Sequence, residues 1–224
     1  MSYEIFNEDC LEGMKNLADS SIDMIATDPP YCVGASSNGI KSSFTDFNLM
    51  RPFFEQLFSE WQRILKDGGH CYCCTDWRTY PFLYPLLVKY LVVRNLIVWD
   101  YSWFKAGNFY RPTHELIIFA TKGKAQRNFP ANEADIWRHE PVNYTKPRLH
   151  NAQKPIELME HMIRNSSVEG DTVLDCFMGS GTTCIAALNL GRKFIGYELD
   201  EKYFDIAQKR ITAAVDEPLF KLEA

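Results

Sequence analysis

The chain has 224 residues, of which 46% are hydrophobic and 24% are charged, and its formal net charge is -5. This length suits one domain with a full hydrophobic core rather than two independent domains, and the composition excludes a disordered or fibrous protein. Since there is no basic N-terminal leader and no apolar run of the roughly 18 residues that a membrane span needs, we expect a cytoplasmic protein without a membrane partner.

The first 27 residues predict a strand, a helix and a second strand. Residues 3–6 suit a short strand, and residues 10–17 carry apolar side chains at helical spacing, with Asp9 placed to cap the helix N-terminus. Residues 22–27 form an apolar run typical of a strand inside a parallel sheet. The next residues therefore lie at the carboxyl end of a strand, where open α/β sheets bind ligands.

Those next residues are Asp28-Pro29-Pro30-Tyr31, which combine a carboxylate, a rigid backbone and a flat ring. The Asp28 carboxylate and the Pro29 carbonyl could hold an amine while Tyr31 stacks on its ring, as a nucleobase removed from its stack requires. An ordinary Asx-Pro turn explains the four residues equally well. The rest of the chain has to decide between a turn and a base-binding socket.

The middle of the chain continues to alternate strand and helix. Residues 32–48, rich in Gly and Ser, predict a long mobile loop. After it we expect an amphipathic helix over 53–65, a strand over 70–75, a helix over 80–90, and strands over 96–101 and 115–121.

Three of the seven cysteines, Cys71, Cys73 and Cys74, fall within the expected strand 70–75. In a reducing compartment they are better read as buried small hydrophobes than as disulfides. A strand sends alternate side chains to opposite faces, so this spacing is a poor tetrahedral zinc site. We expect no metal.

Residues 122–149 lack clean periodicity and interrupt the alternation. Between residues 122 and 154 there are seven basic residues against three acidic ones, so this part of an acidic protein could contact phosphates. A solvated basic loop is the alternative. The candidate DNA-binding residues are Lys122, Lys124, Arg127, Arg138, Lys146 and Arg148.

The last third of the chain predicts a strand, a glycine turn, a helix and a second strand, followed by a final helix over 200–215. The turn is Gly179-Ser180-Gly181-Thr182-Thr183, and Glu198 ends the next strand 17 residues after Gly181, where it can accept ribose hydroxyls. Cys184 stands where the dinucleotide fingerprint has its third glycine, and no Gly-Lys-Ser/Thr follows. S-adenosylmethionine, which carries a carboxylate in place of a pyrophosphate, therefore fits better.

These blocks, in this order, resemble the amino-group DNA methyltransferases of the circularly permuted beta class, which methylate adenine N6 or cytosine N4. The catalytic block 28–31 comes first, the irregular segment 122–149 stands where the family has its target-recognition region, and His150-Asn151-Ala152-Gln153-Lys154-Pro155 resembles the family's His…Gln-Lys-Pro segment. Phe177, Gly179 and Gly181 come last. The resemblance implies one catalytic domain over 1–224 with an α/β, Rossmann-like methyltransferase fold, in which a mixed, mostly parallel seven-stranded sheet carries helices on both faces.

The resemblance also implies a role for each block. Asp28, Pro29, Pro30 and Tyr31 would form the catalytic site, holding and stacking the flipped base of double-stranded DNA. Asp9, with Cys10 beside it, would meet the adenine amine of the cofactor and Glu198 its ribose, while Phe177 would pack on the adenosyl group. Gly179, Ser180, Gly181, Thr182 and Thr183 would face the methionine part of S-adenosylmethionine, with Lys154 near its carboxylate. Asp28 would lie where the two ligands meet, and methyl transfer would need no covalent enzyme intermediate.

Several alternatives stay open at this point. An initial Asp in the catalytic block favours adenine N6, and cytosine N4 is the second choice. A catalytically silent subunit that only binds DNA is a third, although Asp28, Tyr31, Gly179 and Gly181 are intact. So short a recognition segment implies a short target sequence, loose specificity or a homodimer. The family points to a bacterial or phage-encoded setting, with or without a partner restriction enzyme.

Overall fold

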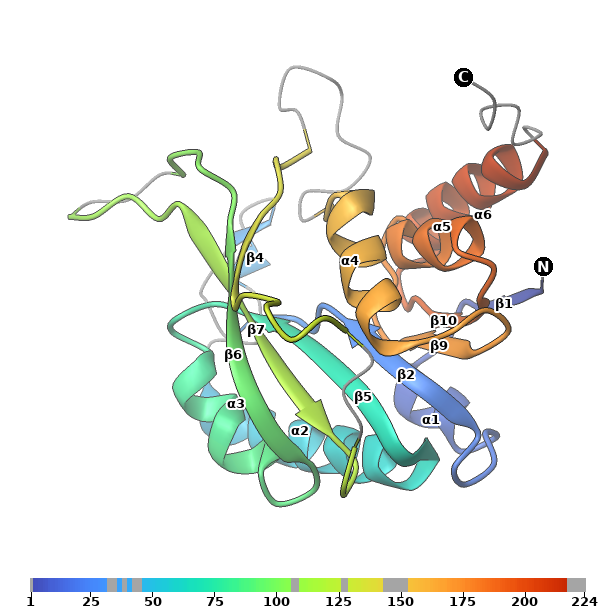
Figure 1. Ribbon diagram of the computed structural model, residues 1–224, viewed down its shortest axis with the longest axis horizontal. Coiled ribbons are helices and arrows are strands. Elements are labelled where there is room, and N and C mark those ends of the chain that lie inside the picture. The colour runs from blue at the N-terminus through green and yellow to red at the C-terminus, as the bar shows by residue number, and fades with distance from the viewer. Residues whose placement is uncertain are drawn as a thin grey trace.

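The computed structural model describes residues 2–31, 36–37, 40–41, 46–105, 109–125, 129–142 and 153–216. They form an α/β domain in which one eight-stranded mixed sheet carries helices on both faces (Figure 1). The strand order is β1-β10-β9-β2-β5-β7-β6-β8. The strands are β1 Tyr3–Phe6, β2 Ile22–Thr27, β5 Leu65–Thr75, β6 Val92–Asp100, β7 His114–Thr121, β8 Ile136–Arg138, β9 Thr172–Asp175 and β10 Lys193–Tyr197. Strands β3 Ser36–Ser37 and β4 Ile40–Lys41 form a separate two-stranded sheet.

The helices bury two apolar cores, one against each face of the sheet. Helices α1 Cys10–Met14, α2 Phe47–Ile64 and α3 Tyr80–Leu87 pack on one face, and α4 Ile156–Ser166, α5 Thr182–Asn189 and α6 Glu201–Asp216 pack on the other. The central strand β2 serves both cores, since Ile25 joins the first and Met24 and Ala26 join the second. This two-sided burial explains why residues 22–27 are an apolar run rather than an alternating pattern.

The sheet has eight strands and not the predicted seven. The additional strand, β8, lies within the segment 122–149, which we expected to be irregular. It pairs in parallel with β6 and is the outermost strand of the sheet. Trp137 at its centre is buried. Three residues are too few to show a period of two, so the sequence pattern could not reveal this strand. The mostly parallel character is confirmed, because among the described strands of this sheet only β7 runs antiparallel to its neighbours, β5 and β6.

Strand direction decides which residues can reach a common site. The carboxyl ends of β1, β10, β9, β2 and β5 lie along one edge of the sheet because these strands are parallel. Strand β7 runs the other way, so its first residues, His114 and Glu115, lie at this edge, where Leu116 pairs with Thr75. Its end lies at the opposite edge, where Thr121 pairs with His70.

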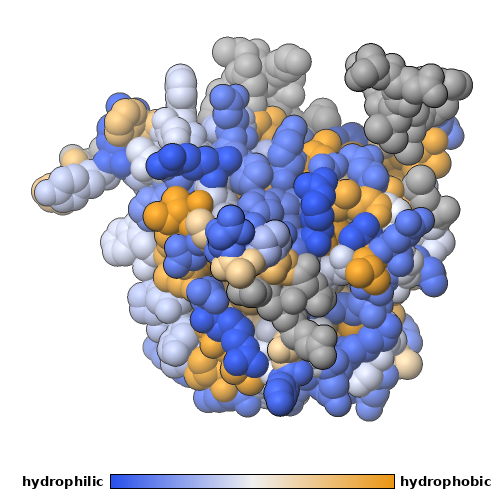
Figure 2. All heavy atoms as spheres, viewed as in Figure 1, coloured by the Kyte–Doolittle hydropathy of each residue, from blue (hydrophilic) through white to orange (hydrophobic). Residues whose placement is uncertain are grey.

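Two further parts of the chain differ from the expectation. Of the predicted mobile loop 32–48, residues 32–35, 38–39 and 42–45 lie outside the described residues, and helix α2 already begins at Phe47. Between β6 and β7 the chain leaves the sheet as an arm that extends away from the domain, and the space-filling view shows the same projection (Figure 2).

None of the helices in the described ranges combines the length and apolar character that crossing a bilayer requires. Cys71, Cys73 and Cys74 are buried free thiols of β5, and burial raises the pKa of each. Across the described part of the chain, no three His, Cys, Asp or Glu side chains are grouped to hold a metal ion.

Candidate active site

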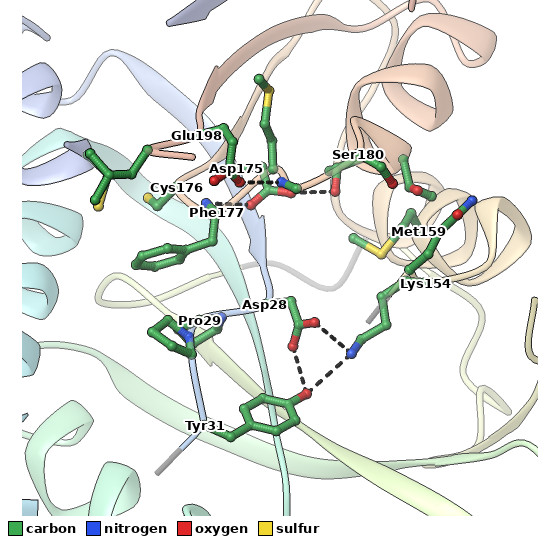
Figure 3. Close-up of a pocket in the computed structure, with 18 of the residues that line it drawn as sticks. Asp28, Pro29, Tyr31, Lys154, Met159, Asp175, Cys176, Phe177, Ser180 and Glu198 are labelled. Carbon is green, nitrogen blue, oxygen red and sulfur yellow. Dashed lines mark hydrogen bonds and ion pairs between the residues drawn. The ribbon is translucent and has the colours of Figure 1, made fainter. Parts of the chain in front are cut away.

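A cavity of about 680 Å³ opens at the edge where the parallel strands end (Figure 3). It is walled by the turns that follow β1, β2, β9 and β10, together with the segment before α4. Most of the predicted site residues line it. They are Asp9, Cys10, Asp28, Pro29, Pro30, Tyr31, Lys154, Phe177, Gly179, Ser180, Thr182, Thr183 and Glu198.

One end of the cavity is built by the glycine turn and by Glu198. The Glu198 carboxylate accepts hydrogen bonds from the backbone N–H of Gly179 at 2.9 Å and of Asp200 at 2.9 Å. Burial raises the pKa of Glu198, although these backbone N–H groups act in the opposite direction. The two bonds fix the carboxylate toward the cavity, and each oxygen keeps a lone pair that can accept a hydrogen bond from a hydroxyl group.

Asp9 caps a helix and also lies at the cavity, so the two roles expected of it are compatible. Its side chain caps α1 by accepting a hydrogen bond from the backbone N–H of Leu11 at 2.7 Å, and it also lines the cavity. Capping occupies one carboxylate oxygen and orients the other. The predicted contact between Asp9 and an adenine amine stays a prediction.

Within the cavity wall, Asp175 ties β9 to β2 and α5. It accepts hydrogen bonds from Thr27 Oγ1 at 2.7 Å, Thr183 Oγ1 at 2.5 Å and the backbone N–H of Phe177 at 3.0 Å. Burial raises the pKa of Asp175 to about 6, although the three donors lower it. These three hydrogen bonds hold the turn after β9 against β2 and α5.

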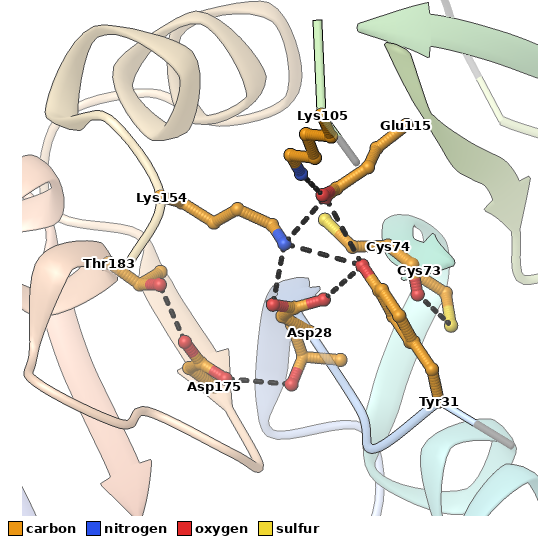
Figure 4. A network of polar contacts seen from close by, with 10 residues as sticks. Asp28, Tyr31, Cys73, Cys74, Lys105, Glu115, Lys154, Asp175 and Thr183 are labelled. Carbon is orange, nitrogen blue, oxygen red and sulfur yellow. Dashed lines mark hydrogen bonds and ion pairs between the residues drawn. The ribbon is translucent and has the colours of Figure 1, made fainter. Parts of the chain in front are cut away.

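The other end of the cavity is a network of charges around Asp28 (Figure 4). Asp28 Oδ1 accepts a hydrogen bond from the Tyr31 hydroxyl at 2.6 Å, and Asp28 Oδ2 pairs with Lys154 Nζ at 2.7 Å. Lys154 Nζ also pairs with Glu115 at 2.8 Å, and Glu115 in turn binds Lys105. The network holds two carboxylates and two ammonium groups, so their formal charges balance.

The surroundings of this network favour its charged form. The side chain of Lys154 is only 9% exposed and that of Glu115 14% exposed. Burial acts to raise the pKa of Glu115, but Lys154 and Lys105 outweigh it and bring that pKa down to about 2. Burial acts to lower the pKa of Lys154, but Asp28 and Glu115 outweigh it and raise that pKa. Burial, together with Asp28 and Glu115, raises the pKa of the Tyr31 hydroxyl, which therefore stays protonated and donates.

Glu115, Lys105 and Arg210 were not among the predicted site residues. Arg210 on α6 holds the glycine turn by donating to Ser180 Oγ at 2.8 Å. Glu115 was missed because the sequence pattern of residues 115–121 does not give the direction of the strand, and only an antiparallel β7 brings its start to the end of the sheet that carries the cavity. The available signal was a carboxylate near the start of a strand whose following residues are apolar.

Two predicted cofactor residues lie differently from the expectation. Gly181 does not line the cavity. It turns the chain into α5 at φ +80°, and a Cβ there would lie 3.1 Å from Ile211. Lys154 lines the cavity, but its ammonium group faces Asp28 and Glu115 at the catalytic end. Its predicted contact with the methionine carboxylate stays a prediction.

The basic residues of segment 122–149 do not form one cluster in the described ranges. Lys122 and Lys124 follow β7 and so lie at the sheet edge opposite the cavity, where Lys122 Nζ donates to the Leu65 carbonyl at 2.7 Å. Arg138 on β8 pairs with Asp100 at 3.5 Å, at the same edge as the site. The remaining candidates, Arg127, Lys146 and Arg148, lie outside the described residues.

The groups that line the cavity fit S-adenosylmethionine. Glu198 can accept the ribose hydroxyls, Phe177 offers a ring to the adenosyl group, and the volume suits a cofactor of this size. The sequence has no Gly-Lys-Ser/Thr to bind a phosphate, which argues against a nucleoside triphosphate in this cavity. The cavity joins a nucleoside-binding end to a carboxylate that can bind an amine.

Comparisons with known proteins agree with this geometry. A family model described as DNA methylase matches residues 22–209. The type II methyltransferase M.HpaI of Haemophilus parainfluenzae is 30% identical over 94% of this chain and 74% of its own length. The DNA adenine methyltransferase YhdJ of Escherichia coli K12 is 28% identical over 94% of this chain and 83% of its own.

A solved structure extends the match to three dimensions. The M1.HpyAVI-SAM complex superposes with a TM-score of 0.73 at 29% identity, covering 93% of this chain and 98% of that one. The family match spans the glycine turn, Glu198 and the catalytic block. Of the expected site residues, only Asp9 and Cys10 precede the matched range. The chain belongs to the DNA methylase family, whose members methylate adenine N6 or cytosine N4.

Proposed function

We infer that this chain transfers the methyl group of S-adenosylmethionine to the N6 amine of adenine in DNA. The observation that carries this function is the position of Asp28. Its carboxylate is held by Lys154 and Tyr31 at one end of a cavity whose other end presents Glu198 and the glycine turn.

The exocyclic amine of a nucleobase is a poor nucleophile because its lone pair is delocalised into the ring. When bound, S-adenosylmethionine supplies an electrophilic methyl group. Asp28 and the Pro29 carbonyl accept hydrogen bonds from the amine and favour a geometry in which the nitrogen lone pair points toward the cavity. Catalysis then rests on orientation and electrostatics.

The geometry supports extrusion of the base from the duplex. Asp28 is recessed beside a cavity, so the amine of a base still within its stack could not reach it. The Tyr31 ring is fixed through its hydroxyl, which donates to Asp28, and it can stack on the extruded base. Ring and carboxylate together bind a planar group that carries an amine.

Adenine is favoured over cytosine by two observations. The catalytic block begins with Asp28 rather than Ser, and the similar protein YhdJ is named as a DNA adenine methyltransferase. The cytosine-N4-specific PvuII DNA methyltransferase is 15% identical, which supports a common fold alone. The four catalytic residues and every expected cofactor residue except Gly181 line one cavity, which argues against a silent DNA-binding subunit.

A transfer assay tests this function. Duplex DNA of mixed sequence is incubated with the protein and methyl-labelled S-adenosylmethionine, and the modified base is identified. We expect N6-methyladenine from the wild type, none from Asp28→Ala, and wild-type transfer from Asp205→Ala, which changes an exposed carboxylate on α6. Asp28→Ala should keep cofactor affinity within a few-fold. Methylcytosine as the product would show that the target base is cytosine and not adenine. A lack of methyl incorporation despite cofactor binding would refute the methyltransferase function.

A further inference from the structure

The arm between β6 and β7 carries large side chains that the fold does not bury. Its described residues are 103–105 and 109–111, which we call the aromatic arm. Phe109 is 98% exposed and Tyr110 is 96% exposed, and Trp103 and Phe104 are about 60% exposed, at 61% and 59%. The arm projects from the body of the domain in both overall views (Figures 1 and 2). Large apolar side chains gathered at an exposed projection indicate an interaction surface.

The charge of the arm indicates the kind of partner. It carries Lys105 and Arg111, and the sequence has no acidic residue between Asp100 and Glu115. The Arg111 guanidinium lies 5.2 Å from the centre of the Phe104 ring and donates to the carbonyls of Phe104 at 3.1 Å and of Lys105 at 3.2 Å. Aromatic rings beside cations, without carboxylates, suit a nucleic acid, whose bases stack and whose phosphates are negative.

The root of the arm is joined to the catalytic network. Lys105 Nζ binds Glu115 and lies 4.4 Å from the centre of the Tyr101 ring. Glu115 pairs with Lys154, which pairs with Asp28, so a chain of three ion pairs connects Lys105 of the arm to the residue expected to hold the target amine (Figure 4). DNA whose target base reaches Asp28 must therefore pass close to the arm.

We propose that the aromatic arm enters the DNA duplex beside the target adenine, where Phe109 and Tyr110 stack in place of the extruded base. This inference rests on the proposed function. Extrusion loses the stacking and pairing of the base, and aromatic side chains inserted between base steps replace part of that stacking. Arg111 contacts a flanking phosphate, while Lys105 stays paired with Glu115 and holds the root of the arm beside the site.

The double variant Phe109→Ala/Tyr110→Ala tests the role of the arm, with Tyr84→Ala, an exposed aromatic on α3, as the matched control. Two substrates are compared at the site that the wild type methylates, one with the target adenine paired to thymine and one with it opposite an abasic position. Because the unpaired adenine is easier to extrude, we expect kcat/KM of the double variant to fall about tenfold or more on the paired duplex and less than about threefold on the abasic one. Tyr84→Ala should equal the wild type on both.

The other outcomes are distinct. Equal loss on both substrates, or no loss on the paired duplex, would overturn the inference while the wild type stays active. An inactive wild type would instead refute the proposed function, and the inference with it. If the double variant changes the sedimentation of the protein without DNA, the arm is an interface between two copies of the chain, which also overturns the inference. Cofactor affinity and Tm should not change, since both side chains are almost fully exposed.

Discussion

Replacing Lys154 by Met removes the cation between two carboxylates and keeps a side chain of similar length. Lys154 Nζ lies 2.7 Å from Asp28 and 2.8 Å from Glu115, and these side chains are 9%, 20% and 14% exposed. Removing one partner of a buried ion pair leaves an uncompensated buried charge, which costs about 3–5 kcal/mol. We expect the free energy of unfolding at neutral pH to fall by this amount. Methyl transfer should fall as well, because Asp28 loses the group that orients it.

Urea unfolding measures the loss and also tests its cause. The second change, Glu115→Gln, removes one of the two carboxylates left behind, so Lys154→Met/Glu115→Gln should recover at least about 1 kcal/mol relative to the sum of the single variants. The pH dependence has a defined sign. Because the pKa of Glu115 is lowered to about 2, its contribution to stability is present above its unfolded value and is lost as the pH falls toward 2. The deficit of Lys154→Met should therefore be smaller at about pH 3 than at pH 7. Additive variants with a deficit independent of pH would refute the reasoning.

Three further changes test other parts of the site. Tyr31→Phe removes the hydroxyl that donates to Asp28 at 2.6 Å, so kcat should fall about tenfold, and Tyr31→Ala should fall further because the ring is lost as well; unchanged kcat for Phe would leave only the ring with a role. Gly181→Ala should lower the free energy of unfolding by about 1–3 kcal/mol more than Gly170→Ala, since both glycines have positive φ but only Gly181 has a neighbour within 4 Å of the added Cβ; equal losses in urea would show that space is unimportant. Glu198→Gln should weaken S-adenosylmethionine binding about tenfold by calorimetry and leave the stability within about 1 kcal/mol, whereas unchanged affinity would remove Glu198 from the cofactor site.

The parts of the fold that follow from local chemistry were predictable. The strand Ile22–Thr27 is a run of apolar residues because both of its faces are buried, and the following two prolines end it at a fixed point. The glycine turn and Glu198 were recognisable because a strand precedes the turn and a helix follows it. These motifs each lie within one short segment of the chain.

The parts that depend on strand direction were not predictable in the same way. Nothing in residues 114–121 states that β7 runs antiparallel to β5, yet this reversal brings Glu115 to the site and carries Lys122 away from it. The Lys154–Glu115 pair joins residues 39 positions apart, and the Lys154–Tyr31 hydrogen bond joins residues 123 apart. Such contacts follow from topology, which a pattern within one segment does not specify.

The charge balance at the catalytic end gives Glu115 a chemical purpose. Lys154 holds Asp28, but an ammonium group paired with Asp28 alone would cancel the carboxylate that faces the positive charge moving onto the amine during transfer. Glu115 shares the Lys154 ammonium group with Asp28, so Asp28 keeps more of its negative charge, and Lys105 in turn compensates Glu115. The network can therefore orient the Asp28 carboxylate firmly without placing a net positive charge where the methyl group moves.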